Sequence, residues 1–590
     1  MQPQAQPFEV GPPQGPFPAG RPKSVLYWAP SRAHFLDLKA RLLRVKGCSE
    51  RSGALVYGSA ALRFWLEHRA QDLVERLHSG YFNLVMLDLR APREVDFAAQ
   101  VEEALEVLDA LDAEPDIEAR FGFHRVVALV SGDGDRTDRL IARLGARKLG
   151  RVLRGPAPGG GWGEASDVFA KLVFDEVSQL LLGRLPGLRA LCCSGGGITG
   201  IYFELGALKC LDDCLRPRGA VSSFDLYFGI SAGATVTGLL ANGYTVDDCL
   251  AAIAGVPGGQ IKPINLSVLR LQMLDVANLA DRVARGLSAI ATALWRARLT
   301  GMRGSLESLL LDYSDLFGPP LRSAPYEQAL REIFTAAGRS NDFRDLQRRL
   351  FIGATDQDLR RHVLFGAPGH DDVPISQAVQ ASSSLHPAFT PTAIKDRWFC
   401  DGAVTSTSHL HEAIRMGADL VFVVDPFLPY VSREPGYARS RGVLYNIDQD
   451  VRTLSYTRFE RHREATLRHH PTVSSYTFLP ANSLRRLLSV NPMDHRPYLA
   501  IWRGAYLSTL RRIQHLRYRM EGDLAHHGLS LDTEVAEAVA AQLRETERPT
   551  LEDFYAGRKP DFSRLASAAG DSALAARESL NGGFSSLRRA

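Results

Sequence analysis

The sequence predicts a multidomain α/β protein with a small parallel α/β domain, a larger parallel-sheet domain and a mainly helical region. Its 590 residues are too many for a single hydrophobic core. Strand and helix patterns alternate on both sides of a glycine-rich segment at 154–166. Such alternation is typical of parallel sheets covered by helices. After residue 426 the pattern becomes mainly helical and basic.

Composition and charge limit the classes of protein to which this chain can belong. Apolar residues make up 45% of the chain and charged residues 23%, as in ordinary globular proteins. The net charge of +4 is too small to indicate nucleic acid as a partner. The seven cysteines lack the paired spacing of metal sites, which favours a reduced cytoplasmic protein with no metal or other cofactor. No segment is long and apolar enough to cross a bilayer, so any membrane association is expected at the surface.

The chain begins with a segment at 1–22 that is rich in proline and glycine and lacks a signal-peptide core, so we expect disorder there. A first domain is expected at 23–156. Its strand candidates are 24–30, 83–90 and 124–133, and its helix candidates are 34–45, 95–111 and 135–146. This pattern predicts a parallel α/β domain of flavodoxin-like size.

Within this domain, the strand Asn83–Arg90 resembles the phosphoacceptor strand of response-regulator receiver domains, with Asp88 at the acceptor position. Ser131 matches the hydroxyl residue at the end of a later receiver strand. The first strand, however, ends in Trp28–Pro30 instead of the acidic pair that holds Mg²⁺ for phosphoryl transfer. The resemblance therefore implies a degenerate receiver that regulates or docks a protein partner. The alternative is a generic α/β domain in which Asp88 caps the next element.

The segment 154–166 is the clearest linker candidate, and residues 157–187 are expected to form a linker and an amphipathic helix. A strand at 188–194 then leads into a run of glycines before the next helix. These glycines are Gly195, Gly196, Gly197 and Gly200. One interpretation is a phosphate loop, but the lysine and spacing of that motif are missing. The other is a set of backbone N–H donors for an oxyanion.

The stretch 224–240 contains the pattern G-x-S-x-G, with Gly229, Ser231 and Gly233, between a predicted strand and a predicted helix. A strand–turn–helix context is what a nucleophile elbow requires. The sharp turn would place the Ser231 hydroxyl at its tip, at the positive end of the helix. The alternative is a turn of small residues in an ordinary α/β unit.

A third motif lies 401 − 231 = 170 positions further along the chain. Asp401 and Gly402 follow a short predicted strand, and a helix and another strand come after them. An aspartate at a strand end, followed by glycine in a turn, can reach a serine on a neighbouring strand.

Together these motifs resemble those of patatin-like phospholipases over residues 188–426. The resemblance implies a parallel-sheet acyl hydrolase that uses a serine–aspartate dyad. Ser231 would be the nucleophile and Asp401 the base, and the N–H groups of Gly195, Gly196, Gly197 and Ala232 would bind the oxyanion. The implied substrate is a lipid carboxylic ester, such as a phospholipid or lysophospholipid, reached by peripheral membrane contact.

The chain departs from the family pattern at Thr199, where the family usually has lysine or arginine. The loss of a positive charge would lower activity or shift preference away from anionic head groups. The residues 405–408 after the aspartate are altered too. Three alternatives stay open: a neutral-lipid lipase or acyltransferase on the same dyad, a regulatory lipid-binding protein with a weakened site, and a serine–histidine–aspartate triad that uses His386 or His409.

Helical cover is expected at 263–345. Its segment 265–304 is apolar on one side and basic towards its end, which suits a membrane-facing lid or a pair of packed helices. The region 427–558 is helical, with clustered arginines that suit either a lipid surface or a solvated face. Residues 559–590 are expected to be a flexible tail.

Overall fold

The computed structural model divides into two compact units. The first unit comprises 1–187, 466–474 and 513–531, and the second comprises 188–465, 475–512 and 532–590. The residues that the structure describes are 22–57, 60–80, 82–91, 97–113, 125–132, 134–181, 187–257, 259–264, 321–386, 388–470, 472–490 and 496–556, with residues 272, 273, 288 and 295. The expectations for 1–21, for nearly all of 265–320 and for 557–590 lie outside the described residues.

The first unit is built on a seven-stranded sheet in the order β2-β3-β4-β1-β5-β6-β7. The strands are β1 (Lys23–Trp28), β2 (Cys48–Arg51), β3 (Ala54–Tyr57), β4 (Ala60–Glu67), β5 (Leu84–Leu89), β6 (Val126–Ser131) and β7 (Val152–Gly155). The five strands β4, β1, β5, β6 and β7 are parallel. Their order in the sheet is the doubly wound order of flavodoxin-like proteins. The sequence analysis predicted β1, β5 and β6, but not the β2–β3 hairpin, β4 or β7.

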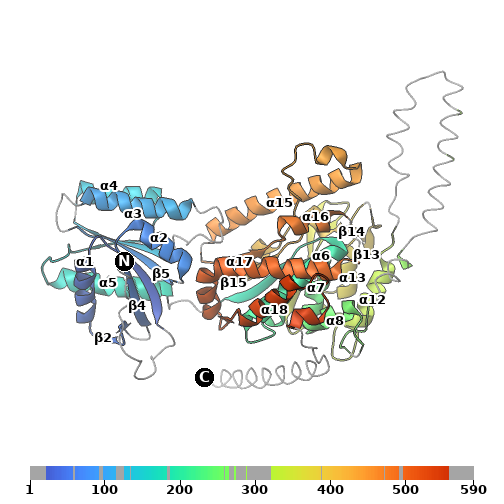
Figure 1. Cartoon of the computed structure of the whole chain (residues 1–590), viewed down its shortest axis with the longest axis horizontal. Helices are drawn as coiled ribbons and strands as arrows, with labels where there is room; N and C mark the ends of the chain where they lie inside the picture. Colours follow the sequence, from blue (N-terminus) through green and yellow to red (C-terminus); the bar gives the residue numbers. More distant parts are fainter. Residues whose placement is uncertain are drawn as a thin grey trace. The chain divides into compact units, whose positions relative to one another are not determined.

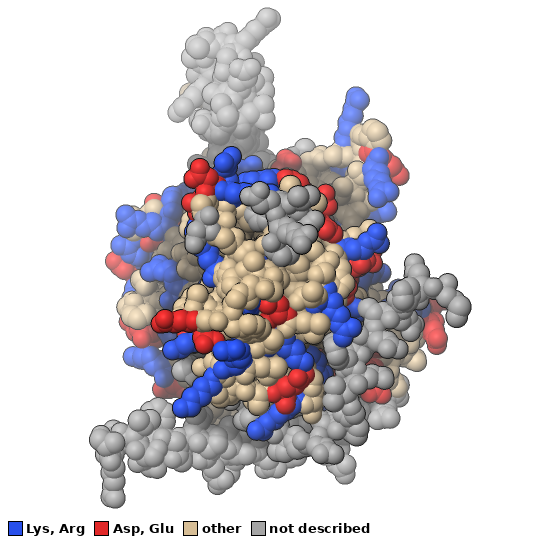
Figure 2. All heavy atoms as spheres, turned by 90° about the vertical axis from the view of Figure 1, so that its left-hand side faces the viewer, with Lys and Arg blue, Asp and Glu red and all other residues tan. Residues whose placement is uncertain are grey.

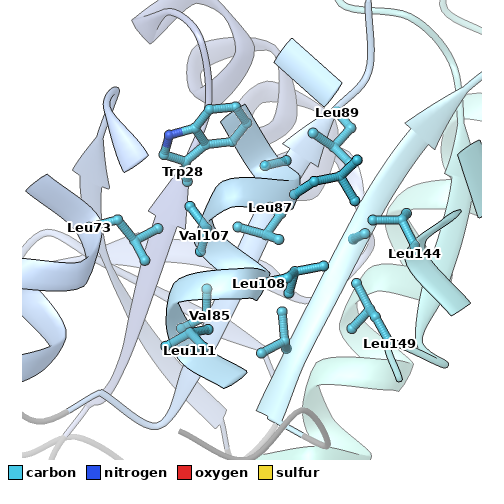
Figure 3. Close-up of a cluster of buried hydrophobic side chains, with 14 of the residues drawn as sticks. Trp28, Leu73, Val85, Leu87, Leu89, Val107, Leu108, Leu111, Leu144 and Leu149 are labelled. Carbon is cyan, nitrogen blue, oxygen red and sulfur yellow. The ribbon is translucent and has the colours of Figure 1, made fainter. Parts of the chain in front are cut away.

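Helices cover both faces of this sheet (Figure 1). They are α1 (Arg32–Arg44), α2 (Ala70–Ser79), α3 (Phe97–Asp112), α4 (Asp135–Ala146) and α5 (Glu164–Leu181). On one face α2, α3 and α4 pack on side chains such as Trp28, Val85 and Leu87 (Figure 3). On the other face α1 and α5 pack on the alternate side chains, such as Tyr27 and Met86. Successive strand residues therefore serve opposite cores, as the two-residue period of a strand requires.

The segment expected as a linker packs against α1. Arg41 is almost fully buried, and its guanidinium donates to the Ser166 hydroxyl at 2.6 Å and to the Gly160 carbonyl at 3.0 Å. The helix expected after the linker, α5, contributes Phe169 and Phe174 to the core of the first unit.

Figure 2 shows the side of the molecule that lies on the left in Figure 1, where lysine and arginine alternate with acidic residues around an uncharged area. This face therefore carries charges of both signs.

The second unit contains an eight-stranded sheet in the order β13-β14-β11-β10-β8-β15-β16, with β12 paired to β11. Its strands are β8 (Leu188–Cys193), β10 (Leu226–Ile230), β11 (Arg349–Asp356), β12 (Arg361–Phe365), β13 (Thr392–Ile394), β14 (Arg397–Asp401), β15 (Ala418–Val424) and β16 (Ser474–Phe478). The central strands β11, β10, β8 and β15 are parallel, and β12 and β14 run antiparallel to β11. Parallel neighbours end at the same edge, so the turns after β8 and β10 meet there.

Helices flank this second sheet (Figure 1). They are α6 (Gly197–Cys214), α7 (Ala232–Ala241), α8 (Val246–Ala254), α12 (Ala324–Phe334), α13 (Ile375–Ser382), α14 (Leu410–Arg415), α16 (Asn482–Val490) and α18 (Glu534–Glu545), with α15 (Val443–His469) and α17 (Tyr498–His526), whose residues from 466 and from 513 onward belong to the first unit. Two short strands, β9 (Leu215–Arg216) and β17 (Ser530–Leu531), complete the regular elements. The region after residue 426 is mainly helical, as predicted, but it also supplies β16 to the sheet.

Candidate active site

The second sheet positions Ser231 between the end of β10 and the start of α7. Its backbone has φ +53° and ψ −116°, a conformation that residues with a side chain rarely adopt. Strain of this kind is retained where the surrounding structure imposes it, and it is common at functional sites. The geometry is that of a sharp strand-to-helix turn with a serine at its apex.

Two glycines allow this turn to form. A Cβ atom on Gly229 would lie 2.4 Å from the Ala234 Cα, and one on Gly233 would lie 2.3 Å from the Cys193 carbonyl oxygen. Neither backbone atom can move without displacing β8 or α7. The spacing of G-x-S-x-G therefore reflects two close backbone approaches on either side of the serine.

Ser382 holds the backbone of the turn in place. The Ser231 N–H donates to the Ser382 hydroxyl at 2.8 Å, and that hydroxyl donates to the Gly353 carbonyl at 2.6 Å. Ser382 is fully buried at the end of α13, so one side chain satisfies two buried backbone groups. Ser382 lies within the range 188–426 that resembles the family, but its sequence context indicated no role. Its partners are far away along the chain, so no local pattern could have indicated the role.

Strand β14 brings Asp401 to the same level of the sheet. Asp401 pairs with Ala354 on β11, and Gly353, the residue before it, pairs with Ile230. The register thus aligns Asp401 with the residue after Ile230, which is Ser231. The chain then passes closely over β11, because a Cβ atom on Gly402 would lie only 2.2 Å from the Gly353 carbonyl oxygen.

The Asp401 carboxylate is buried, and the Ser231 side chain is close enough to it to lower its pKa. Its Oδ1 accepts the Ala403 N–H at 2.8 Å. Burial raises the pKa of Asp401 to about 6, although the Ala403 N–H and the Ser231 side chain act in the opposite direction. A carboxylate with a raised pKa is a better proton acceptor for a hydroxyl group than an exposed one.

The glycine turn after β8 lies against the serine. A Cβ atom on Gly195 would lie 3.3 Å from the Ser231 Cβ and 3.9 Å from its Oγ. Gly196 has no room for a side chain, since a Cβ there would be 2.8 Å from the Pro426 Cγ. Gly197 has φ +65° and begins α6. Within the described part of the chain, no acceptor is found for the N–H groups of Gly195, Gly196, Gly197 and Ala232. Such free donors at two helix N-termini are suited to an anion.

Thr199 lies inside the first turn of α6. It is 1% exposed, and its hydroxyl donates to the Gly196 carbonyl at 3.3 Å. The next glycine, Gly200, packs against Ala232, where a Cβ would lie 3.3 Å from the Ala232 side chain. Thr199 thus stabilises the shape of the glycine turn and brings no charge to it.

The two histidines considered for a triad do not contact the dyad. Among the described residues, no hydrogen bond joins His386 or His409 to Ser231 or Asp401. His409 is buried, and its Nε2 lies 2.9 Å from the Nε2 of His362. Burial lowers the pKa of both members of this pair, that of His362 to about 4. His386 is exposed.

In the first unit, the candidate phosphoacceptor Asp88 is hydrogen-bonded to neighbouring side chains. Asp88 is fully buried, and its carboxylate accepts hydrogen bonds from the Tyr27 hydroxyl and, at 2.7 and 2.9 Å, from the Arg90 guanidinium. Ser131 accepts the Ala91 N–H at 3.0 Å. A carboxylate with these partners is the buried centre of an ion-pair network. Its surroundings are not those of a reactive group. The likeness of this unit to receiver domains remains a prediction.

Residues 191–414 match the family model of patatin-like phospholipases. This part of the chain is similar to that family. We therefore call the second unit the patatin-like unit. The match includes the glycine turn, Ser231 and Asp401.

Two solved structures are similar to the chain at low identity. VipD from Legionella pneumophila has 13% identity and a TM-score of 0.22, over 63% of this chain and 90% of that chain. The type III effector protein ExoU has 17% identity and a TM-score of 0.24, over 61% of this chain and 60% of that chain. The search of curated proteins produced no match. Because both TM-scores are low, the family assignment depends on the sequence match alone. In the described part of the chain, none of the helices has the length and apolarity needed to cross a membrane.

Proposed function

We propose that the patatin-like unit hydrolyses carboxylic esters of lipids, with Ser231 as nucleophile and Asp401 as general base. The observation that carries the proposal is the strand register that aligns the buried Asp401 with Ser231, which is close enough to act on the pKa of that carboxylate. The raised pKa of Asp401 and the free N–H groups beside Ser231 support it. The family match supports lipid acyl hydrolysis as the general activity.

In the first step, the Ser231 oxygen bonds to the ester carbonyl carbon while Asp401 takes the hydroxyl proton. The oxyanion accepts hydrogen bonds from the backbone N–H groups of Gly195, Gly196, Gly197 and Ala232. The ester C–O bond then breaks, and Asp401 gives its proton to the leaving alcohol. In the second step, water attacks the acyl-enzyme, Asp401 accepts the water proton and returns it to Ser231, and the fatty acid leaves.

The proposed substrate is a phospholipid or lysophospholipid, reached by peripheral contact with a membrane in the cytoplasm. All seven cysteines are unpaired and six are buried, in keeping with a reducing compartment. A neutral-lipid lipase or an acyltransferase would use the same dyad. They differ in whether water or an alcohol reaches the acyl-enzyme. A lipid-binding protein with a weakened site is the second candidate, because Thr199 brings no cation to the glycine turn.

The test compares the wild type with Ser231→Ala on p-nitrophenyl butyrate and on phospholipid vesicles. We expect the wild type to release acid from both and the variant to lose activity on the order of 10³-fold or more. Ser222→Ala is the matched control, because Ser222 lies in the same unit and its hydroxyl has no hydrogen-bond partner among the described residues. Equal rates for wild type and Ser231→Ala would remove the hydrolase proposal and leave the lipid-binding candidate.

A further inference from the structure

Helix α15 carries an apolar stripe that nothing in the described part of the chain covers. Ile447, Val451 and Leu454 lie on one side of the helix at the spacing i, i+4, i+7, and they are 52%, 47% and 71% exposed. Isolated exposed apolar side chains are common, but three large ones in register on a single helix are not. The stripe therefore points to something that binds there.

The same side of α15 becomes basic further along. Arg458 and Arg461 continue the stripe at i+11 and i+14 from Ile447, and both are exposed. From Ile447 to Arg461 the stripe is about 21 Å long at the rise of an α-helix. One acidic side chain, Asp450, is exposed at its flank. The apolar and basic halves are thus separated along the helix axis.

This stripe is connected to the proposed active site. The Arg458 guanidinium donates to the carbonyls of Ala403 and Val404 at 3.1 and 3.3 Å, and these residues directly follow Asp401 and Gly402. Val404 is itself 46% exposed. On the other side of Asp401, its N–H donates to the Ser384 carbonyl, and the next residue, Leu385, is 40% exposed. Exposed apolar side chains therefore flank the catalytic loop as well.

We propose that the α15 stripe, comprising Ile447, Val451, Leu454, Arg458 and Arg461, docks the patatin-like unit on an anionic phospholipid surface. This inference rests on the proposed function and names the surface that delivers its substrate. The apolar half enters the boundary between head groups and acyl chains, and the basic half meets lipid phosphates. A helix of mixed apolar and basic character lying in the interface has these two kinds of contact.

The charge pattern favours a lipid surface over a protein partner. A protein-binding helix of this kind would bury a continuous apolar stripe, whereas here the stripe changes to arginine after Leu454. Arginine forms strong paired hydrogen bonds with phosphate oxygens. Docking would also hold Arg458 in place over the Ala403 and Val404 carbonyls, so that the loop carrying Asp401 faces the membrane.

The experiment measures co-flotation with vesicles of phosphatidylcholine, with and without phosphatidylserine. All variants carry Ser231→Ala, so that binding is measured without hydrolysis and does not depend on the proposed reaction. The stripe variant is Val451→Asp with Leu454→Asp. The matched control, Thr453→Asp with Thr457→Asp, adds the same charge to exposed positions on other sides of the same helix. Val451→Ser with Leu454→Ser is the milder form if the aspartates impair folding, which thermal unfolding would reveal.

We expect the parent to bind vesicles with phosphatidylserine, the control to bind about as well, and the stripe variant to bind about tenfold more weakly or worse. Added salt should weaken binding of the parent. Absence of binding by the parent would overturn the proposal, as would equal weakening in control and stripe variant, which would indicate net charge alone. Equal binding to vesicles with and without phosphatidylserine would overturn the role of the basic half.

Discussion

Replacing Asp401 with asparagine should remove both the general base and a pH-dependent cost to folding. Burial raises the pKa of Asp401 from 3.8 to about 6, although the N–H of Ala403 donates to it and the Ser231 side chain also acts to lower this pKa. The difference of about 2 units corresponds to about 3 kcal/mol between the two protonation states. Because the ionised form accepts the serine proton, kcat/KM of the wild type should fall about tenfold per pH unit below pH of about 6.

The same shift predicts the direction of a stability change. The folded protein binds the Asp401 proton more tightly than the unfolded chain does. The raised pKa of Asp401 therefore adds its full amount to the free energy of unfolding below pH of about 4. This contribution is lost as the pH rises through about 6. Asparagine does not ionise. The free energy of unfolding of Asp401→Asn, relative to the wild type, should therefore rise by up to about 3 kcal/mol between pH of about 4 and about 7.

Rates on p-nitrophenyl butyrate and denaturant unfolding, both measured across this pH range, check the two expectations. Asp358→Asn is the control, because Asp358 is an exposed aspartate in the turn after β11. The reasoning is refuted if Asp401→Asn keeps substantial activity with the same inflection, since another group would then be the base. A wild-type inflection near the ordinary aspartate value would refute the argument from burial.

Two further predictions concern groups that hydrogen bonds hold in place. Ser382→Ala would leave the Ser231 N–H and the Gly353 carbonyl without their partner, so the free energy of unfolding should fall by about 2 to 3 kcal/mol, with a lower kcat. Denaturant unfolding tests this, and an unchanged midpoint would contradict it. In the first unit, Mg²⁺ with beryllium fluoride should not raise the unfolding temperature, because Tyr27 and Arg90 occupy the Asp88 carboxylate. Stabilisation that disappears in Asp88→Asn would show that the carboxylate is accessible.

The shortest elements that the sequence failed to predict share a physical cause. β2 and β3 are four residues each, and β16 has five residues in a region dominated by helical patterns. A segment this short carries too little periodicity to be distinguished from its surroundings. Its strand conformation comes from hydrogen bonds to a neighbour that is distant along the chain. The expected linker likewise lacks regular periodicity, yet Arg41 fixes it on α1.

The sequence by itself determined the two α/β patterns and the three turns that carry the candidate site. Those turns depend on residue types that only a few backbone conformations require, above all the glycines around Ser231 and after Asp401. Only the tertiary structure shows that Asp401 is aligned with Ser231 across the sheet and that His409 pairs with His362. It also decided that Ser382 supports the serine and that Asp88 is enclosed. Each of these depends on strand register and burial, which join residues that no local pattern connects.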